Sequence, residues 1–156
     1  YFADYECSFG TRDDLSPNTI IYGHSDLTNN PDGPRFSELF RFTEEDFARS
    51  TPVITFATQE DWMDWEVFAV AEYSTDPRLI QPEPEGGIAA LAADVRKESV
   101  FDYDVQVGDG DHILTLITCT DDTAVRLVIM ARLLDSDAEL PAAAPIASSD
   151  ETSQEV

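Results

Sequence analysis

Residues 112–134 read HILTLITCTDDTAVRLVIMARLL and contain the two most hydrophobic segments of the chain. Residues 112–119 and 125–134 are apolar on both faces instead of alternating, which is typical of buried strands at the centre of a sheet. The loop at 120–125 has a length that suits a hairpin connection. We therefore predict an antiparallel pair of central strands.

The rest of the chain predicts further short strands and brief helices. Runs rich in β-branched and aromatic residues predict strands at 18–24, 52–57 and 65–73. Apolar residues at 88, 91, 92 and 95 recur at helical spacing and predict a helix over 88–97, with a shorter one at 36–40. Strands in succession with few helices indicate a mainly β fold, a closed or partly closed barrel. Only five or six strands can be placed, fewer than the roughly eight of a small filled barrel.

Composition limits the classes of partner. The chain has 156 residues, 42% of them hydrophobic, which suffices for one globular core. It carries 9 Lys and Arg against 32 Asp and Glu, a formal net charge of −23. Phosphate backbones and anionic lipids attract basic surfaces, so nucleic acid and anionic membrane surfaces are not expected partners. No apolar run reaches the roughly 18 residues that span a bilayer.

The end of the chain differs from the rest. Residues 135–156 contain Ala, Pro, Ser and acidic residues, with no Lys or Arg and no apolar periodicity. We predict a domain at 1–134 followed by a disordered acidic tail at 135–156.

Cys119 ends its predicted strand, and the hairpin would make Arg126 its cross-strand neighbour, with Cα atoms about 4.5 to 5.5 Å apart. A guanidinium in this place favours a thiolate and can donate hydrogen bonds to an oxyanion. The alternative is a buried cysteine that acts as a small hydrophobic residue, with Arg126 paired to Asp121 or Asp122. The sequence leaves both interpretations open.

His24 also closes a predicted strand. A lone histidine at a strand end is often structural, but a thiol, an imidazole and a guanidinium together supply the nucleophile, the acid–base group and the oxyanion donor of acyl transfer. His112 is a weaker candidate because it lies at the opposite strand end from Cys119, and Cys7 has no evident partner. The histidines and cysteines lack zinc-type spacing, so no metal site is expected.

These residues carry a resemblance to a known family. Thr115-Leu-Ile-Thr-Cys119, followed by Arg126-Leu-Val-Ile, resembles the cysteine motif and downstream arginine of sortases. Ile21-Tyr-Gly-His24 resembles the sortase histidine motif. The predicted helix at 88–97, ahead of the nucleophile strand, is similar to class B sortases in particular. The resemblance covers residues 17–134.

The resemblance implies a cysteine transpeptidase on an eight-stranded barrel. Cys119 would attack the carbonyl of a Thr in a sorting signal and form a thioester. His24 would protonate the departing amine and later deprotonate the incoming one. Arg126 would hold the substrate and stabilise the oxyanion, with the backbone N–H of Thr120 as a second donor.

By position, Tyr22 and Ile117 would line the groove for the signal peptide; ordinary barrel packing is the alternative for both. The implied partners are the sorting-signal peptide of secreted surface proteins and an amine on a cell-wall precursor or pilin, with no cofactor. The implied location is the extracellular face of the membrane of a Gram-positive bacterium. Attachment to the membrane would be through an anchor that this chain does not contain.

Sortases carry barrel strands before the histidine motif, whereas sixteen residues precede Pro17 here. We therefore expect a barrel without its N-terminal strands. This expectation and the strong acidity raise a second hypothesis, a sortase-derived barrel that no longer catalyses and serves as a binding or structural module. A papain-type protease fits poorly, because those enzymes place the cysteine on an early helix and the histidine later.

Overall fold

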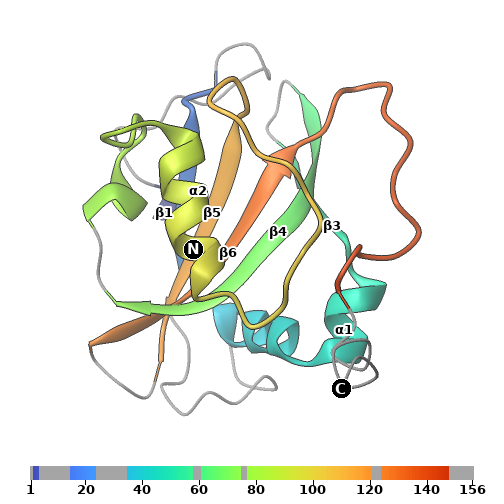
Figure 1. Cartoon of the computed structure of the whole chain (residues 1–156), viewed down its shortest axis with the longest axis horizontal. Helices are drawn as coiled ribbons and strands as arrows, with labels where there is room; N and C mark the ends of the chain where they lie inside the picture. Colours follow the sequence, from blue (N-terminus) through green and yellow to red (C-terminus); the bar gives the residue numbers. More distant parts are fainter. Residues whose placement is uncertain are drawn as a thin grey trace, which may run out of the picture.

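The structure is a computed structural model and describes residues 2–3, 15–23, 35–57, 61–74, 77–120 and 124–147. The strands among these residues belong to one sheet. The strands are β1 (Phe2–Ala3), β2 (Asn18–Gly23), β3 (Val53–Ala57), β4 (Trp62–Ser74), β5 (Ile113–Cys119) and β6 (Val125–Leu133). Their order in the sheet is β1-β2-β5-β6-β4-β3. The sheet curls into an open half-barrel (Figure 1), so the prediction of a mainly β, partly closed barrel is confirmed.

Strands β5 and β6 form the expected antiparallel hairpin in the middle of the sheet. In β5 every residue is buried except Cys119, which is half-buried. Such strands are apolar on both faces because each face is covered, which explains why their sequences do not alternate. Strand β2 runs parallel to β5, and the remaining neighbours are antiparallel.

In the described part of the chain, four short helical segments accompany the sheet: η1 (Arg35–Thr43), α1 (Glu45–Ser50), η2 (Pro77–Ile80) and α2 (Ile88–Lys97). Helix α2 has the bounds expected from its periodicity and lies across one face of the sheet (Figure 1). Its buried residues are the four whose spacing predicted the helix, Ile88, Leu91, Ala92 and Val95. The predicted helix at 36–40 is part of the 3-10 segment η1.

Residues 144–147 pack against the domain, within the segment 135–156 for which composition predicted a disordered tail. Ala144 and Ile146 are buried. Residues 145–147 form an antiparallel bridge with residues 102–104. The N–H of Asp104 donates to the carbonyl of Pro145 at 2.7 Å, and the N–H of Ala147 donates to the carbonyl of Asp102 at 2.9 Å. We call residues 144–147 the C-terminal strap. The rest of the predicted tail, residues 148–156, lies outside the described part of the chain.

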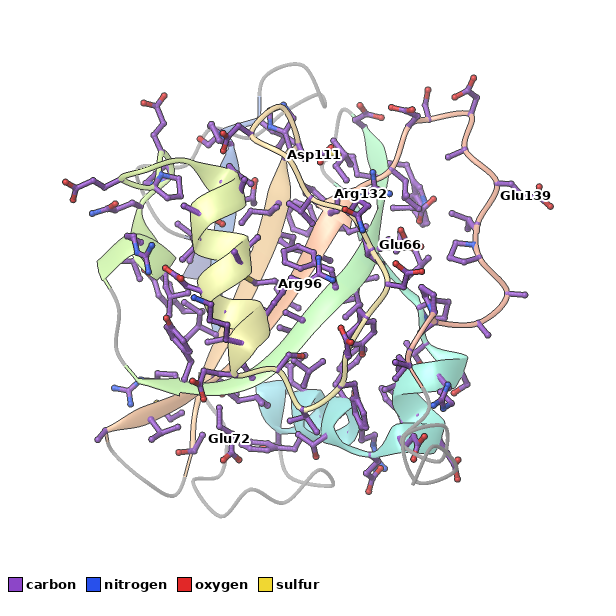
Figure 2. All side chains as sticks on the ribbon, in the orientation of Figure 1. Glu66, Glu72, Arg96, Asp111, Arg132 and Glu139 are labelled. Atoms are coloured by element: carbon purple, nitrogen blue, oxygen red, sulfur yellow. The ribbon has the colours of Figure 1, made fainter. Side chains whose placement is uncertain are left out.

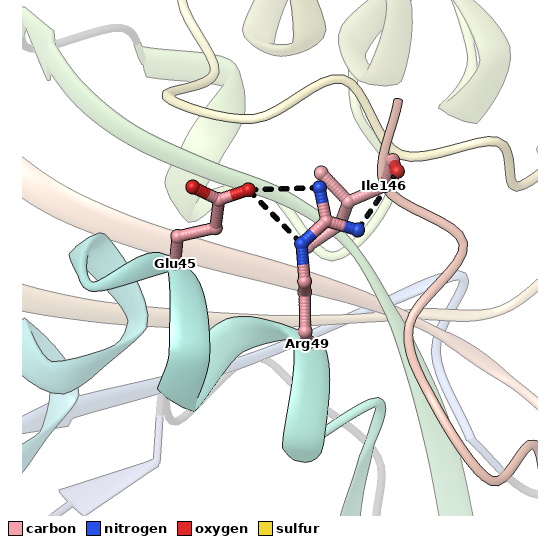
Figure 3. Close-up of polar contacts among 3 residues, drawn as sticks. All are labelled: Glu45, Arg49 and Ile146. Atoms are coloured by element: carbon pink, nitrogen blue, oxygen red, sulfur yellow. Dashed lines mark hydrogen bonds and ion pairs between the residues drawn. The ribbon is translucent and has the colours of Figure 1, made fainter. Parts of the chain in front are cut away.

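The C-terminal strap also binds α1. Arg49 donates from Nη1 to the carbonyl of Ile146 at 3.1 Å, and from Nε and Nη2 to Glu45 at 3.0 and 2.8 Å (Figure 3). The N–H of Ala144 donates to the carbonyl of Arg49 at 2.9 Å. The prediction of disorder used the average composition of residues 135–156. That average does not reveal two individual side chains, Ala144 and Ile146, that are buried, or the backbone bonds beside them.

We expect Ile146→Ala to lower the free energy of unfolding by about 2 kcal/mol or more, because it removes a buried side chain and leaves a cavity. Leu140→Ala is the matched control: Leu140 lies in the same segment but is 49% exposed, so that substitution leaves stability nearly unchanged. Urea denaturation of both variants measures the difference. Equal stability of the two variants contradicts a docked strap.

The amino end of α2 is held by a residue from the turn before β5. Gly87 precedes the helix and has no side chain to cap it, so the carboxylate of Asp109 accepts the N–H of Ala89 at 2.9 Å. Gly87 has φ +95°, a conformation in which only glycine is unstrained. A Cβ atom at this position would lie 2.6 Å from Oδ1 of Asp109. The close approach therefore requires glycine.

We predict that Gly87→Ala destabilises the domain by about 1 to 2 kcal/mol from backbone strain, with a further cost from displacing Asp109. Gly86→Ala separates the two effects, because Gly86 has φ +86° but its Cβ would meet only Ala90 at 3.9 Å. Gly110→Ala, which meets nothing within 4 Å, should be nearly neutral. Thermal unfolding should show the largest loss of stability for Gly87→Ala, a smaller loss for Gly86→Ala and the smallest for Gly110→Ala. A Gly86→Ala variant as unstable as Gly87→Ala would show that the contact with Asp109 adds no cost.

Tyr103 lies in the segment that joins α2 to β5, and its side chain is buried. Arg96 of α2 points toward this segment (Figure 2) and donates to the carbonyls of Tyr103 and Val105. The Tyr103 side chain is 1% exposed, and among the described residues its hydroxyl has no hydrogen-bond partner. Burial raises the pKa of Tyr103 to about 12 from the ordinary 10.0, because the charged phenolate is poorly solvated there.

This pKa shift makes stability fall at alkaline pH. The unfolded chain loses the Tyr103 proton near pH 10.0 and the folded chain near pH 12. Unfolding therefore releases a proton in that pH interval, and the free energy of unfolding falls as pH rises through it.

We expect Tyr103→Phe to be neutral or slightly stabilising at neutral pH, because it removes an unpaired buried hydroxyl. Urea denaturation should show a smaller loss of stability toward about pH 11 in this variant than in the wild type. An equal loss in both proteins contradicts the prediction.

Candidate active site

Cys119 and Arg126 face each other across the β5–β6 hairpin. Cys119 is the last residue of β5 and Arg126 the second of β6, and they are direct Cα partners in the antiparallel register. Paired residues project from the same face of a sheet with Cβ atoms about 4.5 to 5.5 Å apart. Cys119 is half-buried, and its sulfur is a thiol and not part of a disulfide. The predicted cross-strand pair is confirmed.

The carbonyl of Val125 accepts two hydrogen bonds beside this pair. Thr120 donates from its hydroxyl at 3.1 Å, and Arg126 donates from Nη1 at 3.2 Å. Thr120 is 4% exposed, so its side chain points into the hairpin. Asp121 and Asp122, the alternative partners considered for Arg126, lie outside the described residues.

Strand β2 brings a second segment to the same end of the sheet. Its parallel register pairs Tyr22 with Ile117 and Gly23 with Thr118. Tyr22 and Ile117 share the face of Cys119, since side chains two residues apart on a strand point to the same side. Tyr22 is half-buried and Ile117 is 7% exposed. Residue His24, which follows Gly23 directly in the chain, lies outside the described residues.

The sequence did not identify Tyr73. Strand β4 pairs with β6 so that Tyr73 lies opposite Arg126, on the side away from Cys119. The three side chains form a row across three strands, with the arginine in the middle. Tyr73 is also half-buried. An aromatic residue near the end of a predicted strand was its only sequence signal, and nothing local indicated which strand would lie beside it.

His112, the second histidine, lies away from the candidate site. His112 lies at the opposite end of β5, where its Nδ1 is 3.1 Å from the carbonyl oxygen of Ser16. Cys7 lies outside the described residues. Within the described ranges, no group of three or more His, Cys, Asp or Glu side chains is arranged to hold a metal ion. The helices described there are also too short or too polar to cross a membrane.

The chemistry available at this sheet end follows from these groups. A thiol provides a nucleophile for a carbonyl carbon, and a guanidinium in the next strand provides donors for the oxyanion that the attack creates. Acyl transfer also needs a group that delivers a proton to the leaving amine. Strand β2 ends at Gly23, which pairs with Thr118, the residue before Cys119. A histidine, His24, is the next residue in the sequence.

Comparison with known proteins agrees with this arrangement. The sortase domain model matches residues 11–134. Sortase B of Listeria monocytogenes is 34% identical over 138 residues, which are 85% of this chain and 53% of that protein. Sortase B of Staphylococcus aureus is 27% identical over 125 residues, 77% of this chain and 50% of that protein. The chain thus spans about half the length of these curated relatives.

The fold agrees as well. A 2.0 Å crystal structure of Staphylococcus aureus sortase B matches with a TM-score of 0.71 and 26% identity, over 87% of this chain and 64% of that one. Sortases are cysteine transpeptidases, generally anchored in the membrane at the surface of Gram-positive bacteria. The half-barrel and its cysteine–arginine hairpin agree with these matches. Because the sortase domain model covers most of the sequence and sortase B of Listeria monocytogenes is 34% identical, this chain belongs to the sortase family.

Proposed function

We propose that this chain is a sortase transpeptidase that cleaves a sorting signal after Thr through a thioester on Cys119. The acyl group then passes to an amine. The observation that carries the proposal is the register of the β5–β6 hairpin, which sets Cys119 directly opposite Arg126 in a member of this family.

The proposed reaction has two halves. The Cys119 sulfur attacks the carbonyl carbon of the Thr, and the resulting oxyanion accepts hydrogen bonds from the Arg126 guanidinium and the backbone N–H of Thr120. His24 gives a proton to the departing amine, which leaves a thioester. The incoming amine attacks the thioester carbon, His24 removes its proton, and the thiolate departs. The parallel pairing of Gly23 with Thr118 supports this role for His24, because the chain enters that residue from the strand beside Cys119.

Tyr22 and Ile117 are proposed to line the groove for the signal peptide. They are cross-strand partners on the face of Cys119, and Ile117 lies two residues before Cys119 on β5. Tyr22 is half-buried, so part of the residue remains accessible to a peptide. Ile117 is 7% exposed and contributes mainly as the floor beneath it.

The proposed partners follow from solved relatives. Staphylococcus aureus sortase B has been solved as a substrate complex, and sortase B has also been solved with triglycine. We infer that this chain takes a sorting-signal peptide of secreted surface proteins and an amine nucleophile on a cell-wall precursor or pilin. Its proposed place of action is the extracellular face of the membrane of a Gram-positive bacterium.

Cys119→Ala is expected to abolish the thioester and to lower transpeptidation by about 10³-fold or more, because the nucleophile is removed. Cys7→Ala is the matched control and should keep full activity. Mass spectrometry of the protein mixed with a Thr-containing signal peptide detects the acyl-enzyme, and a triglycine acceptor reports transfer. Thermal unfolding checks that both variants fold.

Full activity of Cys119→Ala would end the proposal. A folded wild-type chain that forms no acyl-enzyme, and whose two cysteines react equally slowly with an alkylating agent, would instead identify a non-catalytic binding module.

A further inference from the structure

One carbonyl group connects the residue after the cysteine to the arginine. The Val125 oxygen accepts the Thr120 hydroxyl at 3.1 Å and the Arg126 Nη1 at 3.2 Å. Thr120 leaves β5 immediately after Cys119, and Val125 opens β6 immediately before Arg126. The hydroxyl therefore links the residue that follows β5 to the first residue of β6, next to the Cys119–Arg126 pair.

This bond is partly buried. Thr120 is 4% exposed and Val125 is half-buried. A partly buried hydrogen bond has less competition from solvent than an exposed one, and an acceptor in such a place that loses its donor is costly. The Thr120 hydroxyl thus restricts where the Val125 carbonyl points, and the carbonyl in turn is an acceptor for the guanidinium.

We propose that Thr120 is a positioning residue whose hydroxyl holds the Val125 carbonyl so that the Arg126 guanidinium stays in line with Cys119. This inference rests on the proposed function, since the arginine is the group that receives the oxyanion there. Arginine has several rotatable bonds, and fixing its head group before reaction lowers the entropy that the transition state has to lose. The role belongs to the side chain and is separate from any role of the Thr120 backbone N–H.

Thr120→Val tests the side chain alone, because valine keeps the branched shape and the backbone N–H but removes the hydroxyl. We expect kcat to fall about 2- to 10-fold, which is the range that one hydrogen bond supports, with KM little changed. Thr120→Ser keeps a hydroxyl and should restore most of the lost rate. If Thr120→Val does not fold, Thr120→Ala takes its place with the same expected loss of kcat. Thermal unfolding of each variant identifies the folded ones.

A double-mutant cycle with Arg126→Ala separates positioning from general damage. If Thr120 acts through Arg126, Thr120→Val causes no further loss in the Arg126→Ala background. The overturning results are a Thr120→Val enzyme with wild-type kcat, a Thr120→Ser enzyme as slow as Thr120→Val, or losses that multiply independently in the double mutant.

A second readout does not depend on turnover. The rate at which iodoacetamide alkylates Cys119, resolved from Cys7 by peptide mass spectrometry, should fall in Thr120→Val and in Arg126→Ala, and should fall no further in the double mutant. If the wild type proves inactive on sorting signals but shows this coupling, the positioning role stands and the proposed function fails. If the wild type is active and Thr120→Val changes neither turnover nor alkylation, the proposed function stands and the positioning role fails.

Discussion

The backbone ladder of β5 is the constraint on which the site depends. This strand is bonded on one side to β2 in parallel and on the other side to β6 in antiparallel register. Because a parallel neighbour ends where β5 ends and an antiparallel neighbour begins there, Gly23, Cys119 and Arg126 meet at one end of the sheet. Reversing β2 would send its last residue to the opposite end, near Ile113, and would separate the histidine motif from the cysteine by the length of the strand.

Asn18 fixes the parallel register. It is fully buried, its Oδ1 accepts the Thr115 hydroxyl at 2.6 Å, and its Nδ2 donates to the carbonyls of Leu79 and Gln81 at 3.3 and 3.1 Å. A slip of one residue along β5 would turn this side chain to the other face and leave a buried amide without its partners, at a cost of several hydrogen bonds. The same residue attaches the end of η2 and the residue after it to the sheet, so the long crossover between β2 and β5 is held where the parallel pair begins.

Local patterns predicted the parts of the site that depend on neighbours in sequence. The hairpin that pairs Cys119 with Arg126 needs only two apolar runs and a short loop, and both are visible in the chain. Tyr73 could not be placed in this way, because a bulge between Val67 and Ala69 reverses the faces of β4. Simple alternation assigns Trp65 and Tyr73 to one face, yet their partners on β6, Leu133 and Arg126, lie on opposite faces.

The C-terminal strap is a second part of the fold that local sequence patterns did not predict. Its segment reads as low-complexity, but Ile146 and Ala144 find buried positions because residues 102–104 and α1 present matching backbone groups. The strap lies beyond residue 134, where the family match ends, whereas the cysteine, the arginine and the strand before the histidine lie within it. The bonds of the strap reach Arg49 and residues 102–104, a stretch that Arg96 also holds. Its contribution is therefore to the stability of the connection that leads into β5, while the register of β5 itself determines the geometry of the site.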